Sequence, residues 1–394
     1  MKLKKLSIYL ANSLWCLPSL ILIRILSPIL VIRFCDLRSE RIGHFVSDAA
    51  EHIARNYTKS RKFIDLYYFQ SISNEQWAKM VKRSALIVVP QWFKYLDRLN
   101  RKIVGGNKFF IPSSYTTSRD VDGLFTKFDC KLKFKQSEIK YCENWLQKYG
   151  WKKGEPIIVF LVRDSTYLKQ FFPGKRDWSY HDFRNSEVES FIPAMDWLAN
   201  QGTWVLRMGK VASTPLLTKN NRIIDYAFEE SRSDLLDIWL FTNASLVVST
   251  GTGLDYLAGI YGIPLMFLNY LPLSHIPSFF QGTSIPNPVK FKDSKINLTL
   301  SQMLDHSYLQ QNHYEANNIE IGKLNEEEIL QYITEYWKII NSDSQHSEQL
   351  HDQQSLFWNI FKQHKNYDQF HNWRHPNFLI LDGWLTKMGR TFLK

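Results

Sequence analysis

Cysteine is scarce in this chain: 394 residues contain only Cys16, Cys35, Cys130 and Cys142. They form no CxxC pair, so the sequence predicts neither a disulfide framework nor a structural zinc site, and a reducing cytosol fits best. No internal repeat with a period of about 20–50 residues occurs, and 17 glycines are too few for collagen, which excludes solenoids, propellers and fibres. With 44% apolar residues, a large globular protein remains.

Acidic residues are also scarce in the N-terminal part of the chain. Residues 1–150 hold 26 Lys and Arg against 12 Asp and Glu, whereas the remaining residues hold 23 against 26. The net charge of +11 therefore originates in the N-terminal part. Such a charge suits an anionic lipid surface, a polyanionic substrate or nucleic acid. We expect no nucleic-acid partner, because no nucleic-acid-binding motif accompanies the charge and anionic lipid explains it.

A long uninterrupted apolar run is missing as well. The mostly apolar residues 6–32 follow three lysines, but Arg24, Pro18 and Pro28 interrupt them, and no signal-peptide cleavage site follows. We predict that residues 1–28 form a basic, apolar helical segment on the inner face of the cytoplasmic membrane. The protein would then be cytoplasmic and peripherally membrane-associated. A buried first helix followed by a core strand is the alternative.

After about residue 29, short apolar runs alternate with amphipathic stretches, which is the pattern of βα units in a parallel sheet. The clearest strands are predicted at residues 156–162, 203–207, 246–249 and 264–268. The pattern predicts an α/β protein with two Rossmann-like, doubly wound domains and a helical C-terminal extension. The expected parts are domains at 29–150 and 151–300, a helical segment at 301–340, a linker at 341–355 and an aromatic-rich tail at 356–394.

The clearest chemical motif is Ser249-Thr-Gly-Thr-Gly253, which follows a buried strand and precedes a helix. Gly251 and Gly253 would let a ligand approach the backbone, and N–H groups at a helix start bind phosphate. Ser249, Thr250 and Thr252 add hydroxyl donors. The motif lacks the lysine of a P-loop and the spacing of a dinucleotide fingerprint. An ordinary strand-to-helix turn is the alternative.

Two other strands end in segments that contain arginine. Arg163 and Tyr167 follow the first of these strands, and Arg207 and Gly209 belong to the second. Ligands of open α/β sheets bind outside the carboxyl ends of the strands, and arginine is suited to two-pronged phosphate contacts. In the alternative, structural role, each arginine pairs with a nearby carboxylate such as Asp225, Asp234 or Asp237.

These motifs together resemble a bacterial family of predicted glycosyltransferases of GT-B type, associated with surface-polysaccharide biosynthesis. The resemblance covers about residues 30–340 and includes Phe183-Arg-Asn185, Arg232-Ser-Asp-x-x-Asp237 and, after the first strand, Arg41-Ile-Gly-His44. It implies a GT-B-like fold with the acceptor in the first domain and a nucleotide-sugar in the second. It also adds Arg184 and Asn185 to the expected donor site.

The resemblance implies transfer of a sugar from a nucleotide-sugar donor to a glycan or lipid-linked acceptor. GT-B enzymes commonly stabilise the departing diphosphate with Arg, Lys and helix N-termini, so we expect no cofactor and no metal ion, and we assign this role to Arg163. We do not take Asp120-Val-Asp122 as a metal motif, because it lies in a polar connector expected to belong to the first domain.

The candidates for the base that deprotonates the acceptor hydroxyl are His44, Asp48 and, more weakly, Asp164. His44 follows Gly43 in the first strand-to-helix loop, and an ordinary histidine pKa of about 6.5 suits a general base. The alternative for His44 is a helix-start histidine that bonds backbone groups.

Two other classes of function stay open from the sequence. A GT-B-shaped sugar epimerase or pyruvyl transferase would use a similar donor site. A non-catalytic glycan-binding or assembly protein would bind glycan without turning over a sugar nucleotide. Membrane attachment favours the transferase, because an epimerase acting on a free nucleotide sugar has no need of it.

Overall fold

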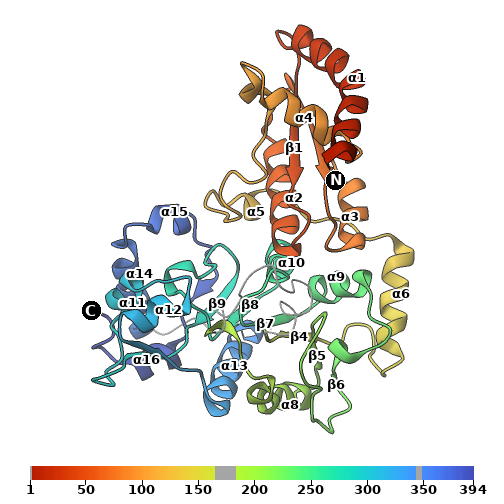
Figure 1. Ribbon diagram of the computed structural model, residues 1–394. Helices are drawn as coiled ribbons and strands as arrows, with labels where there is room; N and C mark the ends of the chain where they lie inside the picture. Colours follow the sequence, from red (N-terminus) through yellow and green to blue (C-terminus); the bar gives the residue numbers. More distant parts are fainter. Residues whose placement is uncertain (1, 165–182, 343–347) are drawn as a thin grey trace. The chain divides into compact units, whose positions relative to one another are not determined.

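The computed structural model describes residues 2–164, 183–342 and 348–394 (Figure 1). The chain divides into two compact units, an N-terminal unit of residues 1–118 and 124–134 and a C-terminal unit of residues 119–123 and 135–394. Within the described ranges, every helix falls short of the length and apolarity that crossing a bilayer requires.

The N-terminal unit is built on a small parallel sheet with the order β1-β2-β3. Its strands are β1 (Val31–Leu37), β2 (Phe63–Phe69) and β3 (Ile87–Val88). Its helices are α1 (Lys2–Leu26), α2 (Ile42–Asn56), α3 (Glu75–Lys82), α4 (Phe93–Arg101), the 3₁₀ turn η1 (Gly106–Phe109) and α5 (Leu124–Lys127). In the βαβ unit β1-α2-β2, Val31 pairs with Phe63 and Leu37 with Phe69.

Helix α1 packs on α4 and on the sheet of its own unit. Cys16, Leu20 and Ile23 recur at helical spacing and are buried together with residues such as Phe34 and Leu96. The predicted helical segment is present as α1, which runs through Pro18 and ends before Pro28. One side of α1 is therefore buried in the core of its unit, and the strand β1 follows it. Membrane association of this segment stays a prediction.

The C-terminal unit is built on a seven-stranded parallel sheet with the order β12-β9-β8-β7-β4-β5-β6. Its strands are β4 (Ile157–Leu161), β5 (Trp204–Arg207), β6 (Ile223–Ile224), β7 (Leu246–Ser249), β8 (Leu265–Leu268), β9 (Gly282–Ile285) and β12 (Phe378–Leu379). The four predicted strands are confirmed to within one residue at each end. Every residue of β4 is buried, as expected for a strand covered on both faces.

Helices cover both faces of this sheet (Figure 1). Around it lie α6 (Gln136–Gln147), η3 (Val188–Phe191), α8 (Ile192–Asn200), η4 (Tyr226–Phe228), α9 (Asp234–Thr242), α10 (Asp255–Tyr261) and η5 (Leu273–His275). The extension adds α11 (Leu300–Asp305), α12 (Gln311–Ala316), α13 (Glu326–Asn341), α14 (Glu348–Lys362), α15 (Tyr367–His371), α16 (Asp382–Met388) and the antiparallel pair β10 (Val289–Phe291) and β11 (Ile319–Ile321).

The order of the strands contains a reversal that positions the site. From β4 the chain proceeds to β5 and β6 on one side, then returns to β7, next to β4, and proceeds to β8 and β9 on the other. In doubly wound sheets, ligands bind at the carboxyl ends of the two strands that flank such a reversal. The predicted α/β class, with a parallel sheet in each unit, is confirmed, and the reversal directs attention to the loops after β4 and β7.

The parts differ from the prediction at two borders. Helix α6, expected in the first domain, belongs to the C-terminal unit because Trp145 packs edge-on against Tyr226 and donates a 2.8 Å hydrogen bond to the Ser231 hydroxyl. Part of the predicted linker at 341–355 is helical, since α14 begins at Glu348. Phe357 joins the main core from this helix, so the extension is part of the C-terminal unit.

Candidate functional site

The loops after β4 and β7 are joined to one another by the backbone. The Thr250 N–H donates to the carbonyl of Leu161, and the Arg163 N–H donates to Thr250 Oγ1 at 2.9 Å. The carbonyl of Arg163 accepts a hydrogen bond from the Ser186 N–H, which draws the segment containing Arg184 and Asn185 to the same edge. The predicted convergence of these segments is therefore present.

The Gly/Thr loop differs from the prediction, because its donors are used within the loop. The Gly251 N–H donates to Ser249 Oγ at 3.0 Å, and the Thr252 N–H donates to the Asp255 carboxylate at 2.5 Å. Asp255 is 3% exposed, and burial raises its pKa to about 7 against hydrogen bonds from Thr252 and Ser249, which lower it. An internal carboxyl group thus occupies the start of α10, where the sequence predicted phosphate.

Gly251 has a structural reason of its own to be glycine. Its φ of +87° lies in the left-handed region, and a Cβ there would lie 2.8 Å from Cε2 of Tyr270. Tyr270 therefore packs directly on the loop. Its hydroxyl donates to the carbonyl of His275, which links the loop to the segment around His275.

Arg119 is a basic residue whose charge acts on Tyr270, and the sequence reasoning did not single it out. Its Nη2 atom donates to the carbonyls of His275 and Ile276 at 3.1 and 3.0 Å, and its guanidinium carbon lies 4.8 Å from the centre of the Phe370 ring. Its Nε atom is buried without a hydrogen-bond partner among the described residues. Burial lowers the pKa of Arg119, and no carboxylate of the described chain opposes that shift.

Arg119 and Arg184 act together on the side chains around them. Both lower the pKa of His275, which burial brings to about 4, so this histidine is neutral at pH 7. Both also act on the buried hydroxyl of Tyr270, which donates to the carbonyl of His275. The acid that acts on Tyr270 is Asp255. Two guanidinium groups, those of Arg119 and Arg184, therefore act on Tyr270 together with one carboxyl group of raised pKa, that of Asp255. The excess of positive charge favours the binding of an anion.

The three residues singled out after β4 are Arg163, Asp164 and Tyr167, and they differ in their surroundings. Arg163 is half-buried at the end of the strand, next to Thr250. Asp164 accepts hydrogen bonds from the N–H and the hydroxyl of Ser213, so it holds the loop after β5 and is poorly placed to act as a base. Tyr167 lies outside the described residues.

Arg207 has the structural role that the sequence left as an alternative. Its side chain is 2% exposed, and its guanidinium donates to Asp225 at 2.9 Å and to the carbonyl of Thr214. Gly209 lies close to the Cβ atom of Ala227 and offers its carbonyl to Arg232. The ion pair with Asp225 argues against the predicted phosphate contact from Arg207.

The two base candidates of the N-terminal unit, His44 and Asp48, lie on α2 and are linked through Arg38 and Ser118. Asp48 is fully buried, and the Arg38 guanidinium holds both of its oxygens. Burial raises the pKa of Asp48 to about 6 against this pairing, but the carboxylate has no exposed oxygen to reach a substrate, which argues against a role as base. His44 Nδ1 lies 3.3 Å from the Ser118 hydroxyl, and burial with the charges of Arg38 and Arg41 lowers the pKa of His44. Its imidazole is thus neutral at pH 7, the form that accepts a proton.

Asp120 and Asp122 belong to the C-terminal unit, whereas the sequence placed them in a connector of the first domain. Asp120 is 3% exposed. Across residues 2–164, 183–342 and 348–394, no group of three or more His, Cys, Asp or Glu side chains is arranged to hold a metal ion.

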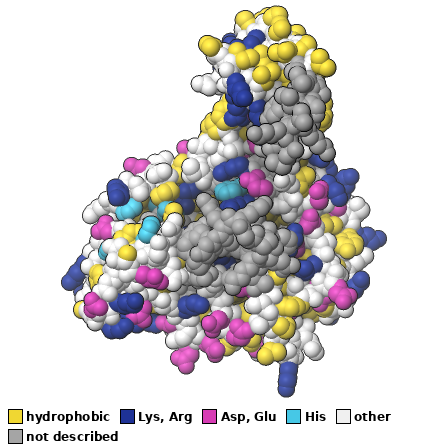
Figure 2. Space-filling model, viewed as in Figure 1, with side chains coloured by type: hydrophobic (Ala, Val, Ile, Leu, Met, Phe, Trp, Pro, Cys, Tyr) yellow, Lys and Arg dark blue, Asp and Glu magenta, His cyan; other side chains and the backbone are white. Residues whose placement is uncertain are grey.

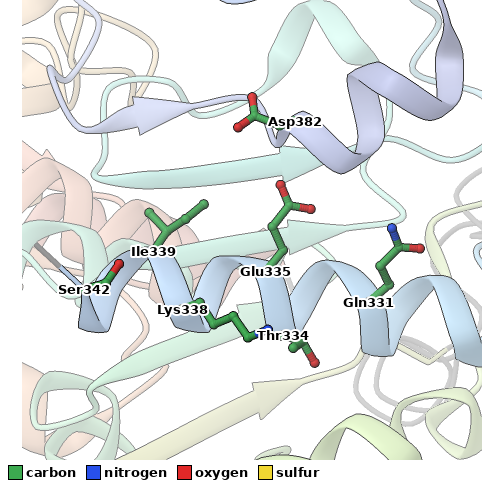
Figure 3. Close-up of a pocket in the computed structure, with 7 residues that line it drawn as sticks. All are labelled: Gln331, Thr334, Glu335, Lys338, Ile339, Ser342 and Asp382. Atoms are coloured by element: carbon green, nitrogen blue, oxygen red, sulfur yellow. The ribbon is translucent and has the colours of Figure 1, made fainter. Parts of the chain in front are cut away.

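Two cavities open on the C-terminal unit. The larger, of about 470 Å³, lies between α13 and the start of α16, where Glu335 accepts a hydrogen bond from the Gly383 N–H (Figure 3). No loop at the carboxyl edge of the sheet contributes to it. The smaller, of about 320 Å³, is lined by residues that include Phe183, Tyr314 and Ile319. It adjoins Arg184, which follows Phe183 in the sequence. The charge of Arg184 lowers the pKa of Tyr314, against the increase that burial causes.

Among solved structures, the chain is similar to an E. coli ADP-heptose lipopolysaccharide heptosyltransferase II, with 13% identity, a TM-score of 0.40, and coverage of 64% of this chain and 90% of that one. It is also similar to a family 9 glycosyl transferase from Veillonella parvula (10% identity, TM-score 0.42, 66% and 86%). A third is an E. coli heptosyltransferase determined with ADP (12% identity, TM-score 0.39, 78% and 98%). No protein-family model and no curated protein matches the chain.

Arg119 was missed because the residues that give it its surroundings are far away in the sequence. It precedes Asp120 in a polar connector, with no strand before it and no glycine loop after it. Its carbonyl partners and ring neighbours come from residues 275–279 and 370. Local sequence carries no signal for a buried arginine of this kind.

Proposed function

We propose that this chain is a glycosyltransferase that moves a sugar from a nucleotide-sugar to a glycan or lipid-linked acceptor in cell-surface polysaccharide biosynthesis. The observation that carries the proposal is Arg119, a guanidinium with a buried Nε atom and no carboxylate partner in the described chain. Its charge acts on Tyr270, the ring that packs on the loop after β7. A buried charge of this kind is costly unless an anion joins it. The diphosphate of the donor is such an anion.

In the proposed reaction, the acceptor oxygen attacks the anomeric carbon of the donor sugar. The bond between that carbon and the diphosphate oxygen breaks, and the nucleoside diphosphate leaves with the electron pair. Arg119 and Arg184 offset the negative charge that develops on the leaving group, with Arg163 at the end of β4 as a third candidate. This arrangement needs no metal ion, and the acceptor proton passes to His44, which is neutral at pH 7.

The nucleoside of the donor has a proposed place beside the arginines. The cavity lined by Phe183 and Tyr314 adjoins Arg184, and its volume of about 320 Å³ lies within the range of small-molecule sites. Aromatic side chains give a base an apolar surface, and Lys292 and Lys323 at the rim add polar contacts for a ribose. The base itself is left to experiment.

Thermal unfolding with a panel of nucleoside diphosphates and nucleotide sugars tests the proposal. A ligand that binds only the folded chain raises the melting temperature, by about 2.7 kcal/mol of stability at a hundred times its Kd. Arg119→Gln should abolish this shift, and Arg119→Lys should recover little of it, because an ammonium group lacks the two-pronged geometry of a guanidinium. The donor found in this way is then assayed for transfer.

Arg390→Gln is the matched control, because this arginine is exposed and belongs to the same unit. It should keep the full nucleotide shift. The absence of a shift with every nucleotide of the panel, or an equal shift in the parent and in Arg119→Gln, contradicts the proposal. Binding of a nucleotide sugar followed by isomerisation of the free sugar nucleotide would instead support an epimerase.

A further inference from the structure

Helix α1 is apolar on two opposite sides, and its own unit covers one of them. Cys16, Leu20 and Ile23 face the core. The opposite side carries an exposed apolar stripe of Leu14, Leu17, Ile21, Leu22 and Ile25, with Ile29 in the turn that follows. These side chains are 51% to 82% exposed. The spacing places the five helical residues on one side of the helix.

A second element extends this stripe at the end of α1. Arg24 reaches across from α1 and donates to the carbonyl of Val104 at 2.8 Å and to the side chain of Asn100 at 2.9 Å. It thereby fixes the turn after α4, in which Ile103 is 37% and Val104 is 94% exposed. Figure 2 shows hydrophobic side chains gathered at this end of the N-terminal unit. We call the exposed stripe of α1 together with Ile103 and Val104 the apolar face.

The charges around the apolar face have one sign. Exposed Arg98, Arg101, Lys102 and Lys108 belong to α4 and to the segment that follows it. Residues 1–30 contain no Asp or Glu, and residues 86–110 contain one, Asp97, which is buried and bound to Arg101. An apolar surface with a rim of cations and no exposed acid complements an anionic lipid layer.

We propose that the apolar face rests on an anionic lipid bilayer, with α1 lying along the surface, Val104 and Ile25 inserted among the acyl chains and the cationic rim on the headgroups. This inference does not depend on the proposed donor site, since its residues belong to the N-terminal unit alone. It goes further than the expectation for residues 1–28, because it adds the turn after α4 as a second contact and specifies the side of α1 that inserts.

Lipid fits this face better than a protein partner. A stable protein interface pairs apolar residues with a polar rim of mixed character and shaped pockets. Here the rim is cationic throughout, and the apolar side chains are Leu, Ile and Val on a convex helix. A second copy of the chain would bring two cationic rims together, which is repulsive.

The test is sedimentation of the full chain with vesicles. Vesicles of phosphatidylethanolamine and phosphatidylglycerol should bind the parent, and vesicles of phosphatidylcholine alone should bind it weakly. The double variant Ile25→Asp with Val104→Asp should partition about 100-fold less, close to tenfold for each exposed side chain withdrawn from the lipid. About 1 M salt should also weaken binding of the parent, because it screens the cationic rim.

Leu217→Asp is the matched control, because Leu217 is equally apolar and 84% exposed but belongs to the C-terminal unit. It should bind vesicles like the parent, and all variants should keep the melting temperature of the parent. A parent that does not bind phosphatidylglycerol vesicles, or a double variant that binds them equally well, overturns the proposal. A parent that is dimeric by light scattering and becomes monomeric in the double variant overturns it in favour of a second copy.

Discussion

Arg207 and Arg119, two arginines of the C-terminal unit, have opposite surroundings. At the end of β5, Arg207 is enclosed with Asp225 in an ion pair of 2.9 Å, and Asp225 also accepts the Leu216 N–H. Beside the loop after β7, Arg119 has backbone carbonyls and aromatic rings for neighbours but no carboxylate among the described residues. The difference separates an arginine that completes the fold from one to which we assign a ligand.

The sequence gives these two arginines the opposite ranking. Arg207 follows an apolar strand and is part of a recognisable motif, whereas Arg119 lies in a connector. Whether a carboxylate lies next to the guanidinium separates the two roles, and only the folded structure shows where the carboxylates lie. Three variants examine this distinction.

The largest expected effect is on the stability of Arg207→Gln. Removing one partner of a buried ion pair costs about 3–5 kcal/mol, which corresponds to a fall in melting temperature of about 6–12 °C or more. Arg222→Gln is the matched control, because the pair of Arg222 with Glu155 is more exposed and such pairs contribute about 0–1 kcal/mol. Calorimetry or circular dichroism measures both. A stable Arg207→Gln that has lost its nucleotide shift would reverse the comparison.

A smaller effect is expected for Arg119→Gln without ligand. The variant loses two bonds to backbone carbonyls and the ring contacts, but it no longer buries a guanidinium whose pKa is depressed. These changes oppose one another, so the melting temperature should stay within about 1 kcal/mol of the parent, or a few degrees. A fall as large as that of Arg207→Gln would show that Arg119 is structural.

A pH-dependent effect concerns Asp255, whose charge acts on the same Tyr270 hydroxyl as Arg119 and Arg184. Burial raises its pKa from 3.8 to about 7, so the folded chain retains a proton that the unfolded chain releases. Stability therefore falls as the pH rises through this window, and the loss is complete above pH 7.

Asp255→Asn has no proton to lose at this position. Its melting temperature, relative to the parent, should increase between pH 5 and pH 8. Thermal unfolding of the two proteins over this range measures the change. A constant difference across the range would mean that Asp255 is ionised throughout and neutralises Arg119 after all.

The fold was predictable where a pattern reports burial. The strands β4, β5, β7 and β8 are short apolar runs between turns, and their ends agree with the prediction to within one residue. The start of α13 also has a local cause that is visible in the sequence, because Asn325 and Glu328 form a capping box there. The position of α6 was not predictable, because the Trp145 contact that draws it to the second unit joins residues far apart in the sequence.

The candidate site was predictable in its location and not in its chemistry. The glycine loop after β7 does meet the end of β4. Which of its donors are already satisfied depends on Asp255, whose carboxyl group turns back on the Thr252 N–H. The same motif would bind phosphate or close on itself, and a single buried carboxyl group makes the difference.

The edge strand β12 has a consequence for the making of the protein. Phe378 pairs with Gly282, so the last strand of the sheet comes from the end of the chain. During synthesis, β9 leaves the ribosome before α14, β12 and α16 have been made. The apolar surface that α14 and α16 cover in the folded unit is exposed during this time. Until then the nascent sheet has an open edge, a state that attracts chaperones and other unpaired strands. The synthesis of β12, and not that of the ligand loops, therefore sets the earliest moment at which the seven-stranded sheet can be complete.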